Sequence, residues 1–234
     1  MNLQGVTDNT ASVLNQIKSY NELGRYYLVG GTALAIRINS RLSEDIDLFF
    51  YNNYPGKKTP LPKLGEILKK INADFGSVKY LDGDNKYYAR LVVDGVKLEL
   101  HSDNRFHKPN SHDKLDQIKL PSEQDLIGMK ITALHLRNAW RDVYDLYSLK
   151  QTHDLTSFYT GYNRIMSSNY CGSKKNKGKL FFATMAKLED IDLLEKMYMD
   201  DNLEHLNPVY KLDPQKAVKE FFGFTDSMKN SQKP

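Results

Sequence analysis

A pair of glycines stands between a short β-type segment and a helix-forming segment, and Thr32 follows it directly. Backbone N–H groups at Gly30 and Gly31 could approach phosphate oxygens closely, because no side chain intervenes and the start of a helix carries positive potential. Thr32 would add a hydroxyl group to the same site. The pattern favours a phosphate-binding turn, although a glycine pair is also common in simple tight turns.

Two aspartates, Asp45 and Asp47, follow the glycine pair at the start of the next β-type segment. Alternation along a strand would place both carboxylates on one face, ~6 to 7 Å apart, while Ile46 and Leu48 point to the core. Such oxygens suit Mg²⁺ or Mn²⁺, with water and substrate phosphates filling the remaining coordination positions. The alternative is a solvated strand face, but this strand continues into apolar residues that should be buried.

A third carboxylate is offered by Glu99, which lies between two leucines in the β-type segment 96–102. Together with Asp45 and Asp47 it would complete a metal site of the kind that supports two ions. His101 falls on the same face of that strand and could lie behind the ligands, but a single histidine beside a sheet is more often structural.

Lys130 interrupts an apolar stripe on the predicted helix 123–137. Burying an ammonium group without an anion is costly, so a phosphate or carboxylate partner is expected. Asp142 and Asp145, on the next predicted helix, could orient Lys130 or accept the proton of an acceptor hydroxyl. The alternatives are a lysine whose charge reaches solvent at the edge of the stripe and a purely structural ion pair with Asp142.

Other basic side chains are weaker candidates for phosphate contacts. Four arginines could grip phosphate or carboxylate groups, or simply form surface pairs: Arg37, Arg41, Arg137 and Arg141. The Ser/Lys/Asn/Gly-rich tract 172–179 holds the densest basic run: Lys174, Lys175, Lys177 and Lys179. We expect this tract to be a solvated, mobile loop, with contact to a polyanionic acceptor as the sharper alternative.

The elements that must position these residues follow from hydrophobic periodicity. Helices are predicted over 11–23, 32–37, 62–75, 123–137, 141–150, 155–166, 180–199 and 214–222, and strands over 26–29, 46–50, 86–93 and 96–102. Asp94-Gly95 favours a type I′ hairpin turn between the last two strands. The sequence thus predicts an α+β protein with a mixed region over 1–105, a linker or surface loop over 106–120 and a helical region over 121–234.

Composition limits the classes of protein that need to be considered. Of 234 residues, 40% are hydrophobic and 26% charged, as in an ordinary globular protein. No apolar run approaches the ~18 residues of a membrane span, and the first residues do not resemble a secretory signal, so we expect a cytoplasmic protein without a membrane partner. The net charge of +4 is compatible with a nucleotide or nucleic-acid partner. The single cysteine, Cys171, is expected to be an inert thiol.

The motifs together resemble the AbiEii/AbiGii-type nucleotidyltransferase toxins of the polymerase-β-like superfamily. The resemblance covers about 25–150 and rests on four features: Gly30-Gly31-Thr32, Arg41-x-Ser43-x-Asp45-Ile46-Asp47, Lys130 in a helix, and the segment from Arg141 to Tyr147. Thr32 stands where the superfamily often has serine, and Glu99 where aspartate is common; both differences conserve the chemistry.

The resemblance implies a nucleotidyltransferase-fold mixed sheet flanked by helices, followed by a helical domain that completes the nucleotide cleft. It implies Mg²⁺-dependent transfer of an NMP from an NTP to an acceptor hydroxyl. The metal ligands would be Asp45, Asp47 and Glu99, and the catalytic set would add Lys130 and Asp142. The nucleotide would be bound by Gly30, Gly31, Thr32, Arg41, Ser43, Lys130 and Asp145.

The resemblance also implies partners. The protein would be the toxin of a bacterial toxin–antitoxin or phage-defence system, with a separate antitoxin protein and an RNA acceptor such as the 3′ end of tRNA. Transfer to the hydroxyl of a small molecule or a protein is an alternative within the same chemistry. A nucleotide-binding module without turnover is an alternative outside it, which the intact set of acids and Lys130 disfavours.

Overall fold

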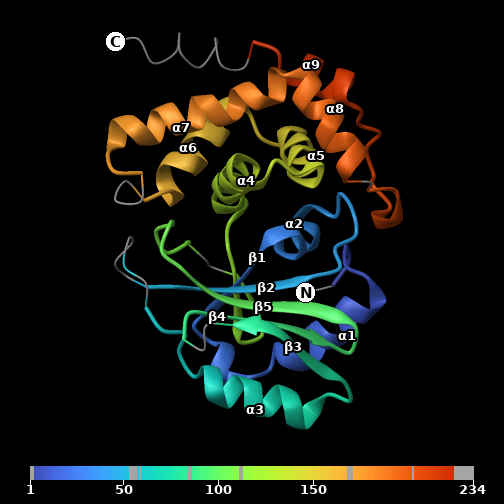
Figure 1. Ribbon diagram of the computed structural model, residues 1–234, viewed down its shortest axis with the longest axis vertical. Helices are drawn as coiled ribbons and strands as arrows, with labels where there is room; N and C mark the ends of the chain where they lie inside the picture. The colour runs from blue at the N-terminus through green and yellow to red at the C-terminus, as the bar shows by residue number, and fades with distance from the viewer. Residues whose placement is uncertain are drawn as a thin grey trace. The chain divides into compact units, whose positions relative to one another are not determined.

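The computed structural model describes residues 3–52, 57, 59–83, 86–110, 113–167, 171–201 and 203–223. The chain divides into two compact units, Met1–Glu123 and Gln124–Pro234. The first unit holds all the strands of the described residues, and the second is helical (Figure 1). This arrangement confirms the predicted α+β fold class with a mixed sheet and a helical C-terminal region.

The N-terminal unit is built on one mixed sheet. Its strands lie in the spatial order β3 (Val78–Gly83), β4 (Tyr88–Val93), β5 (Val96–Asp103), β2 (Ile46–Tyr51), β1 (Tyr26–Val29), β7 (Ile118–Leu120) and β6 (Asp113–Leu115). The pairs β2·β5 and β1·β7 are parallel, while β1·β2 and the two hairpins β4·β5 and β6·β7 are antiparallel. The central strands β1, β2 and β5 are therefore the ones that carry the glycine turn and the acids.

Helices cover both faces of this sheet. Helix α2 (Gly30–Ile38) lies on one face, and α1 (Asp8–Ile17) and α3 (Leu64–Asp74) lie on the other (Figure 1). Helix α3 packs on the sheet through an apolar face, because its buried residues Leu64, Ile67 and Ile71 recur at helical spacing. The β4–β5 connection confirms the predicted type I′ turn, since Asp94 and Gly95 both have positive φ.

The C-terminal unit consists of α4 (Glu123–Arg137), α5 (Trp140–Lys150), α6 (Leu155–Ile165), α7 (Lys174–Ala186), α8 (Ile191–Asp200) and α9 (Pro214–Phe221), with short 3₁₀ turns between some of them. Its core contains large buried aromatic residues, among them Trp140, Phe158 and Phe181. Helices α4 and α6 can approach closely because Gly128 has no side chain. A Cβ atom at Gly128 would lie only 2.7 Å from the Gly161 carbonyl oxygen. Within the described residues, no helix has the length and apolar character needed to span a bilayer.

The structure differs from the sequence prediction in the segment 106–120. Part of this predicted linker forms the two three-residue strands β6 and β7, and β7 extends the sheet beside β1. Leu115, Ile118 and Leu120 are buried there, but the strands are too short for their alternation to stand out in the sequence. Strand β3 was also not predicted, because nearly all its side chains are exposed at the sheet edge.

The basic tract 172–179 is a second difference, since it is not a loop. Helix α7 begins at Lys174, and the Ser173 hydroxyl caps it by accepting a hydrogen bond from the Asn176 backbone N–H at 3.1 Å. Lys177 is buried and donates a hydrogen bond to the Asn163 carbonyl oxygen. The predicted helix 180–199 is also interrupted, because Asp190 caps a new helix, α8.

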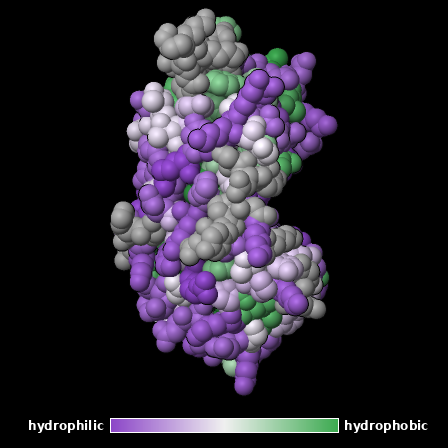
Figure 2. All heavy atoms as spheres, turned by 90° about the vertical axis from the view of Figure 1, so that its left-hand side faces the viewer, coloured by the Kyte–Doolittle hydropathy of each residue, from purple (hydrophilic) through white to green (hydrophobic). Residues whose placement is uncertain are grey.

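Most of the surface facing the viewer in Figure 2 is hydrophilic, with small hydrophobic patches.

Candidate active site

The glycine turn lies between strand β1 and helix α2, as predicted. Helix α2 begins at Gly30, whose φ of +70° is a conformation that residues with a side chain rarely adopt. A Cβ atom built on Gly30 would overlap the Oδ2 atom of Asp47. The Asp47 carboxylate therefore lies directly against the first residue of the helix, which explains why this position needs glycine.

Thr32 connects this turn to the acidic strand. Its hydroxyl lies 2.9 Å from the Ser43 hydroxyl and also contacts the carbonyl oxygen of Asp45. Both Thr32 and Ser43 are buried. These contacts favour a positioning role for the two hydroxyl groups over direct contact with a phosphate.

Arg41 brings a buried positive charge to the same turn. A Cβ on Gly31 would lie 2.8 Å from Nη2 of Arg41 and 3.0 Å from Oγ of Ser43, so the guanidinium packs against the glycine backbone. The Arg41 Nη1 atom donates a hydrogen bond to the carbonyl oxygen of Leu42 at 2.9 Å. Two of the predicted phosphate-binding groups, the glycine turn and Arg41, are thus brought together.

The acidic pair lies at the start of β2: Asp47 is in the strand, and Asp45 directly precedes it. Ile46 and Leu48 are fully buried, while Asp45 and Asp47 are half-buried, a burial pattern in which alternate residues face the core. Asp47 is the register partner of Val29 at the end of β1, which explains its approach to the glycine turn. The sheet thus places a pair of potential metal ligands beside a potential phosphate site.

Glu99 is the register partner of Asp47 on β5. Its carboxylate lies 2.7 Å from the Lys97 ammonium and 3.0 Å from Nε of Arg90. Burial raises the pKa of Glu99, but Lys97 and Arg90 outweigh this effect and hold it below its ordinary value. Among the described residues no group of three or more acids, histidines or cysteines is arranged to hold a metal ion, so Glu99 as a third ligand to the metal of Asp45 and Asp47 stays a prediction.

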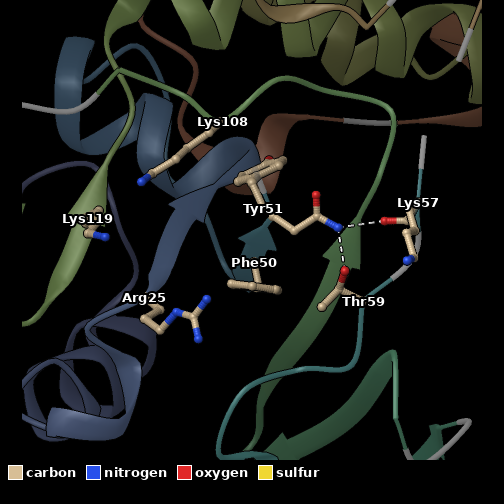
Figure 3. A pocket seen from close by; sticks show the side chains of 8 residues that line it. Arg25, Phe50, Tyr51, Lys57, Thr59, Lys108 and Lys119 are labelled. Carbon is tan, nitrogen blue, oxygen red and sulfur yellow. Dashed lines mark hydrogen bonds between the residues drawn. The ribbon is translucent and has the colours of Figure 1, made fainter. Parts of the chain in front are cut away.

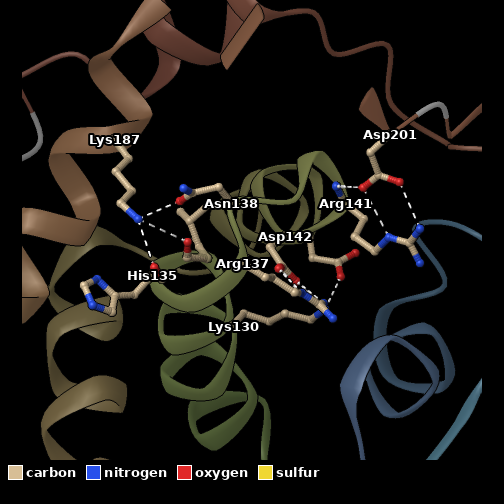
Figure 4. A network of polar contacts seen from close by, with 10 residues as sticks. Lys130, His135, Arg137, Asn138, Arg141, Asp142, Lys187 and Asp201 are labelled. Atoms are coloured by element: carbon tan, nitrogen blue, oxygen red, sulfur yellow. Dashed lines mark hydrogen bonds and ion pairs between the residues drawn. The ribbon is translucent and has the colours of Figure 1, made fainter. Parts of the chain in front are cut away.

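The other predicted residues belong to the helical unit, where they form a buried charge cluster (Figure 4). The Lys130 ammonium on α4 lies 3.2 Å from Oδ1 of Asp142 and 2.5 Å from Oδ2 of Asp145, both on α5. Arg137 adds a two-pronged contact to Asp142, at 2.7 and 2.8 Å. The prediction that Lys130 has a phosphate or carboxylate partner is confirmed by these two carboxylates. The participation of Lys130 in a nucleotide site stays a prediction.

Two other candidate arginines are engaged in ion pairs. Arg141 grips Asp201 through its side chain and its backbone N–H, with the shortest contacts at 2.9 Å. Arg37 pairs with Asp113 at 2.7 Å and donates two further hydrogen bonds to the carbonyl oxygen of Pro121. The sequence carries no local signal for these pairs, because their members are 60 and 76 residues apart.

Comparison with known proteins gives relatives in sequence and in fold. The chain is 27% identical over 143 residues to an uncharacterized protein of Aquifex aeolicus (strain VF5), a match over 60% of this chain and 65% of that protein. A protein from H. pylori that is described as a nucleotidyltransferase has a similar structure. Its TM-score is 0.56 at 16% identity, over 95% of this chain and 94% of that one.

The nucleotidyltransferase toxin MenT4 of Mycobacterium tuberculosis H37Rv is a second structural neighbour. Its TM-score is 0.52 at 15% identity, over 93% of this chain and 82% of that one. Both structural similarities show a nucleotidyltransferase-type fold. The family model for the AbiEii nucleotidyl transferase toxins of type IV toxin–antitoxin systems matches residues 14–223. The match covers most of the chain, which therefore belongs to the AbiEii family.

Proposed function

We propose that the protein is an Mg²⁺-dependent nucleotidyltransferase that moves an NMP from an NTP to a hydroxyl group of RNA, such as the 3′ end of tRNA. The observation that carries this proposal is the contact between the Asp47 carboxylate and the glycine turn. This contact places a carboxylate, a usual ligand of Mg²⁺, beside a backbone turn at the start of α2 that is suited to bind phosphate. Membership of the AbiEii family supports the same chemistry.

The reaction exchanges one phosphorus–oxygen bond for another. The acceptor hydroxyl gives its proton to solvent water, its oxygen bonds to the α-phosphorus, and the bond between that phosphorus and the bridging oxygen of the leaving pyrophosphate breaks. Negative charge grows on the leaving pyrophosphate, so the site needs groups that stabilise this charge. The Gly31 backbone and the buried Arg41 guanidinium are suited to this task.

The acids present fit Mg²⁺. Asp45 and Asp47 are half-buried at the start of β2, and Mg²⁺ usually takes one or two carboxylates together with water and substrate phosphates. Bound there, the ion would supply positive charge to the phosphates. Glu99 lies beside Asp47 in register, and its lowered pKa makes it a fixed negative charge and a weak base.

The biological setting that we propose is a toxin neutralised by a separate antitoxin protein. The family description supports this setting, since it places AbiEii proteins in type IV toxin–antitoxin systems. An RNA acceptor is compatible with the net charge of +4.

The experiment that tests the function incubates the purified full chain with Mg²⁺, each α-³²P-labelled NTP and total tRNA. We expect label on RNA with at least one NTP. The Asp47→Asn variant should lose transfer by ~10³-fold or more, because it removes a metal ligand. Asp116→Asn is a matched control, since Asp116 is an exposed aspartate in the β6–β7 turn, and it should retain transfer.

The position of the label separates the alternatives. Label on the protein itself would favour a protein acceptor, and label on a small molecule would favour the second enzymatic alternative. Label nowhere, with NTP binding intact, would favour the module without turnover. Equal transfer by Asp47→Asn and the unaltered chain would contradict the proposed site.

A further inference from the structure

A pocket of about 380 Å³ opens at the opposite end of β1 and β2 from the acidic pair. It is lined by basic, aromatic and polar residues: Arg25, Phe50, Tyr51, Asn52, Lys57, Thr59, Lys108 and Lys119. We call it the basic pocket. Figure 3 shows Arg25, Lys108 and Lys119 on one side of it and Lys57 with Thr59 on the other. No acidic side chain is among the lining residues.

Four segments distant in sequence line the basic pocket. Arg25 precedes β1, Phe50 and Tyr51 end β2, Lys119 lies in β7, and Lys108 lies in the connection before β6. The sheet order β2-β1-β7 brings the first three elements side by side. The convergence is therefore a property of the fold.

The cations of the basic pocket have no carboxylate partner among the described residues. Arg25, Lys57, Lys108 and Lys119 are absent from the ion pairs of the N-terminal unit, whereas Arg37, Arg90 and Arg105 all pair with acids. The acid beside Tyr51 in register, Asp103, is already neutralised by Arg105. The pocket therefore holds uncompensated positive charge.

Lys119 shows the electrostatic cost of this arrangement. Burial lowers the pKa of its ammonium group, and repulsion from Lys108, Lys114 and Arg25 lowers it further. Its ammonium lies 5.3 Å from the centre of the Tyr27 ring, which stabilises the charge only weakly. An anion in the pocket would relieve the repulsion.

The aromatic rings of the pocket are not available for stacking on bases. Phe50 is 2% exposed and Tyr51 3% exposed, and the Arg25 guanidinium covers the Phe50 ring at 4.8 Å from its centre. Base recognition on single strands uses exposed rings. Contacts in the basic pocket would therefore go to phosphate and would not depend on base sequence.

We propose that the basic pocket binds the phosphate backbone of the RNA acceptor at a distance from its reacting end. This inference rests on the proposed function for the identity of the RNA. Asp45 and Tyr51 are six residues apart along a nearly straight chain segment, which corresponds to about 20 Å. This distance corresponds to several nucleotides of RNA. The basic pocket would therefore hold the backbone of an RNA whose reacting end lies at the acidic pair.

The test measures binding of fluorescein-labelled single-stranded RNA to the full chain by anisotropy, without NTP, over a range of salt concentrations. The pocket variant is Lys108→Gln/Lys119→Gln. The control is Lys69→Gln/Lys79→Gln, which removes the same charge from exposed lysines of α3 and β3. Each variant lowers the net charge from +4 to +2, because two lysines are replaced.

We expect the pocket variant to lose two phosphate contacts. The slope of log K against log salt should then become shallower by about 1.4, and affinity at about 0.1 M salt should fall about 25-fold. The control should change both quantities much less. Equal losses in the two variants would show a general charge effect and overturn the proposal, as would unchanged RNA binding in the pocket variant.

Two further measurements separate this inference from its alternatives. If the pocket variant loses NTP affinity and keeps RNA affinity, the pocket is a nucleotide site and the proposal fails. If the unaltered chain binds RNA through the pocket but transfers no label to it, the RNA site stands and the proposed reaction fails.

Discussion

The buried charge cluster around Lys130 permits a quantitative test of what this lysine does. Lys130 and Arg137 face Asp142 and Asp145, so two positive charges oppose two negative ones in these ion pairs. The Lys130 side chain is 4% exposed, and those of Asp142 and Asp145 are 0% and 1% exposed. Lys130→Met keeps the length of the stem but removes the buried positive charge that contacts both buried carboxylates, whereas the Arg137 side chain is 54% exposed.

Removing one member of a buried ion pair typically costs ~3 to 5 kcal/mol, because the remaining charge stays desolvated. We therefore expect Lys130→Met to lower the free energy of unfolding by about that amount. Adding Asp145→Asn restores charge balance, so the double variant should be more stable than Lys130→Met by more than ~1 kcal/mol. The exposed Lys79→Met is the control and should change stability by less than ~0.5 kcal/mol.

The assay is urea unfolding followed by tryptophan fluorescence. Trp140 is the single tryptophan of the chain, is 2% exposed and lies in α5 with both acids, so its signal reports the helical unit. A double variant no more stable than Lys130→Met would refute the charge-balance reasoning. A Lys130→Met protein with unchanged stability and a kcat ~10²-fold lower would instead place Lys130 on the leaving pyrophosphate, the role that the family resemblance implies.

Two further predictions concern the N-terminal unit. Gly30→Ala should abolish most transfer, because the new Cβ would displace Asp47. Gly95 has a similar positive φ but open space where a Cβ would lie, so Gly95→Ala should cost ~1 kcal/mol of stability and leave transfer intact. Transfer rates and thermal melts of both variants check this. Glu99→Gln should lower stability by ~1 kcal/mol or less at neutral pH. Because the folded-state pKa of Glu99 is lowered, its contribution is complete above its ordinary value of 4.5 and is lost as pH falls through the folded value, so urea midpoints of the two proteins should converge in acid.

The parts of the site that could be predicted are those set by local geometry. The Asp94-Gly95 turn fixes the register of its hairpin, and this register pairs Arg90 with Glu99 across it. The strand period of two correctly predicts that Ile46 and Leu48 are buried while Asp47 between them is half-buried. The apolar stripe around Lys130 required a carboxylate or phosphate partner, and the structure supplies carboxylates.

The parts that escaped prediction depend on contacts between distant segments or on very short elements. The pair Arg141–Asp201 joins α5 to the end of α8, and no pattern in either segment indicates the other. Strands β6 and β7 have three residues each, fewer than periodicity can detect. The basic pocket needs the sheet order itself, since β1, β2 and β7 become neighbours only in the folded unit.

The two units differ in how they use positive charge, and this difference bears on where an anionic substrate would bind. In the helical unit the arginines and lysine of the predicted site are matched by acids: Lys130 and Arg137 with Asp142 and Asp145, and Arg141 with Asp201. In the N-terminal unit Arg41 packs against the glycine turn, and the cations of the basic pocket lack acidic partners among the described residues. Compensated cations add little to the attraction of a polyanion, because each contact with phosphate would first require an existing ion pair to break. Among the predicted site residues and the cations of the basic pocket, those of the N-terminal unit should therefore contribute most to the salt dependence of RNA binding.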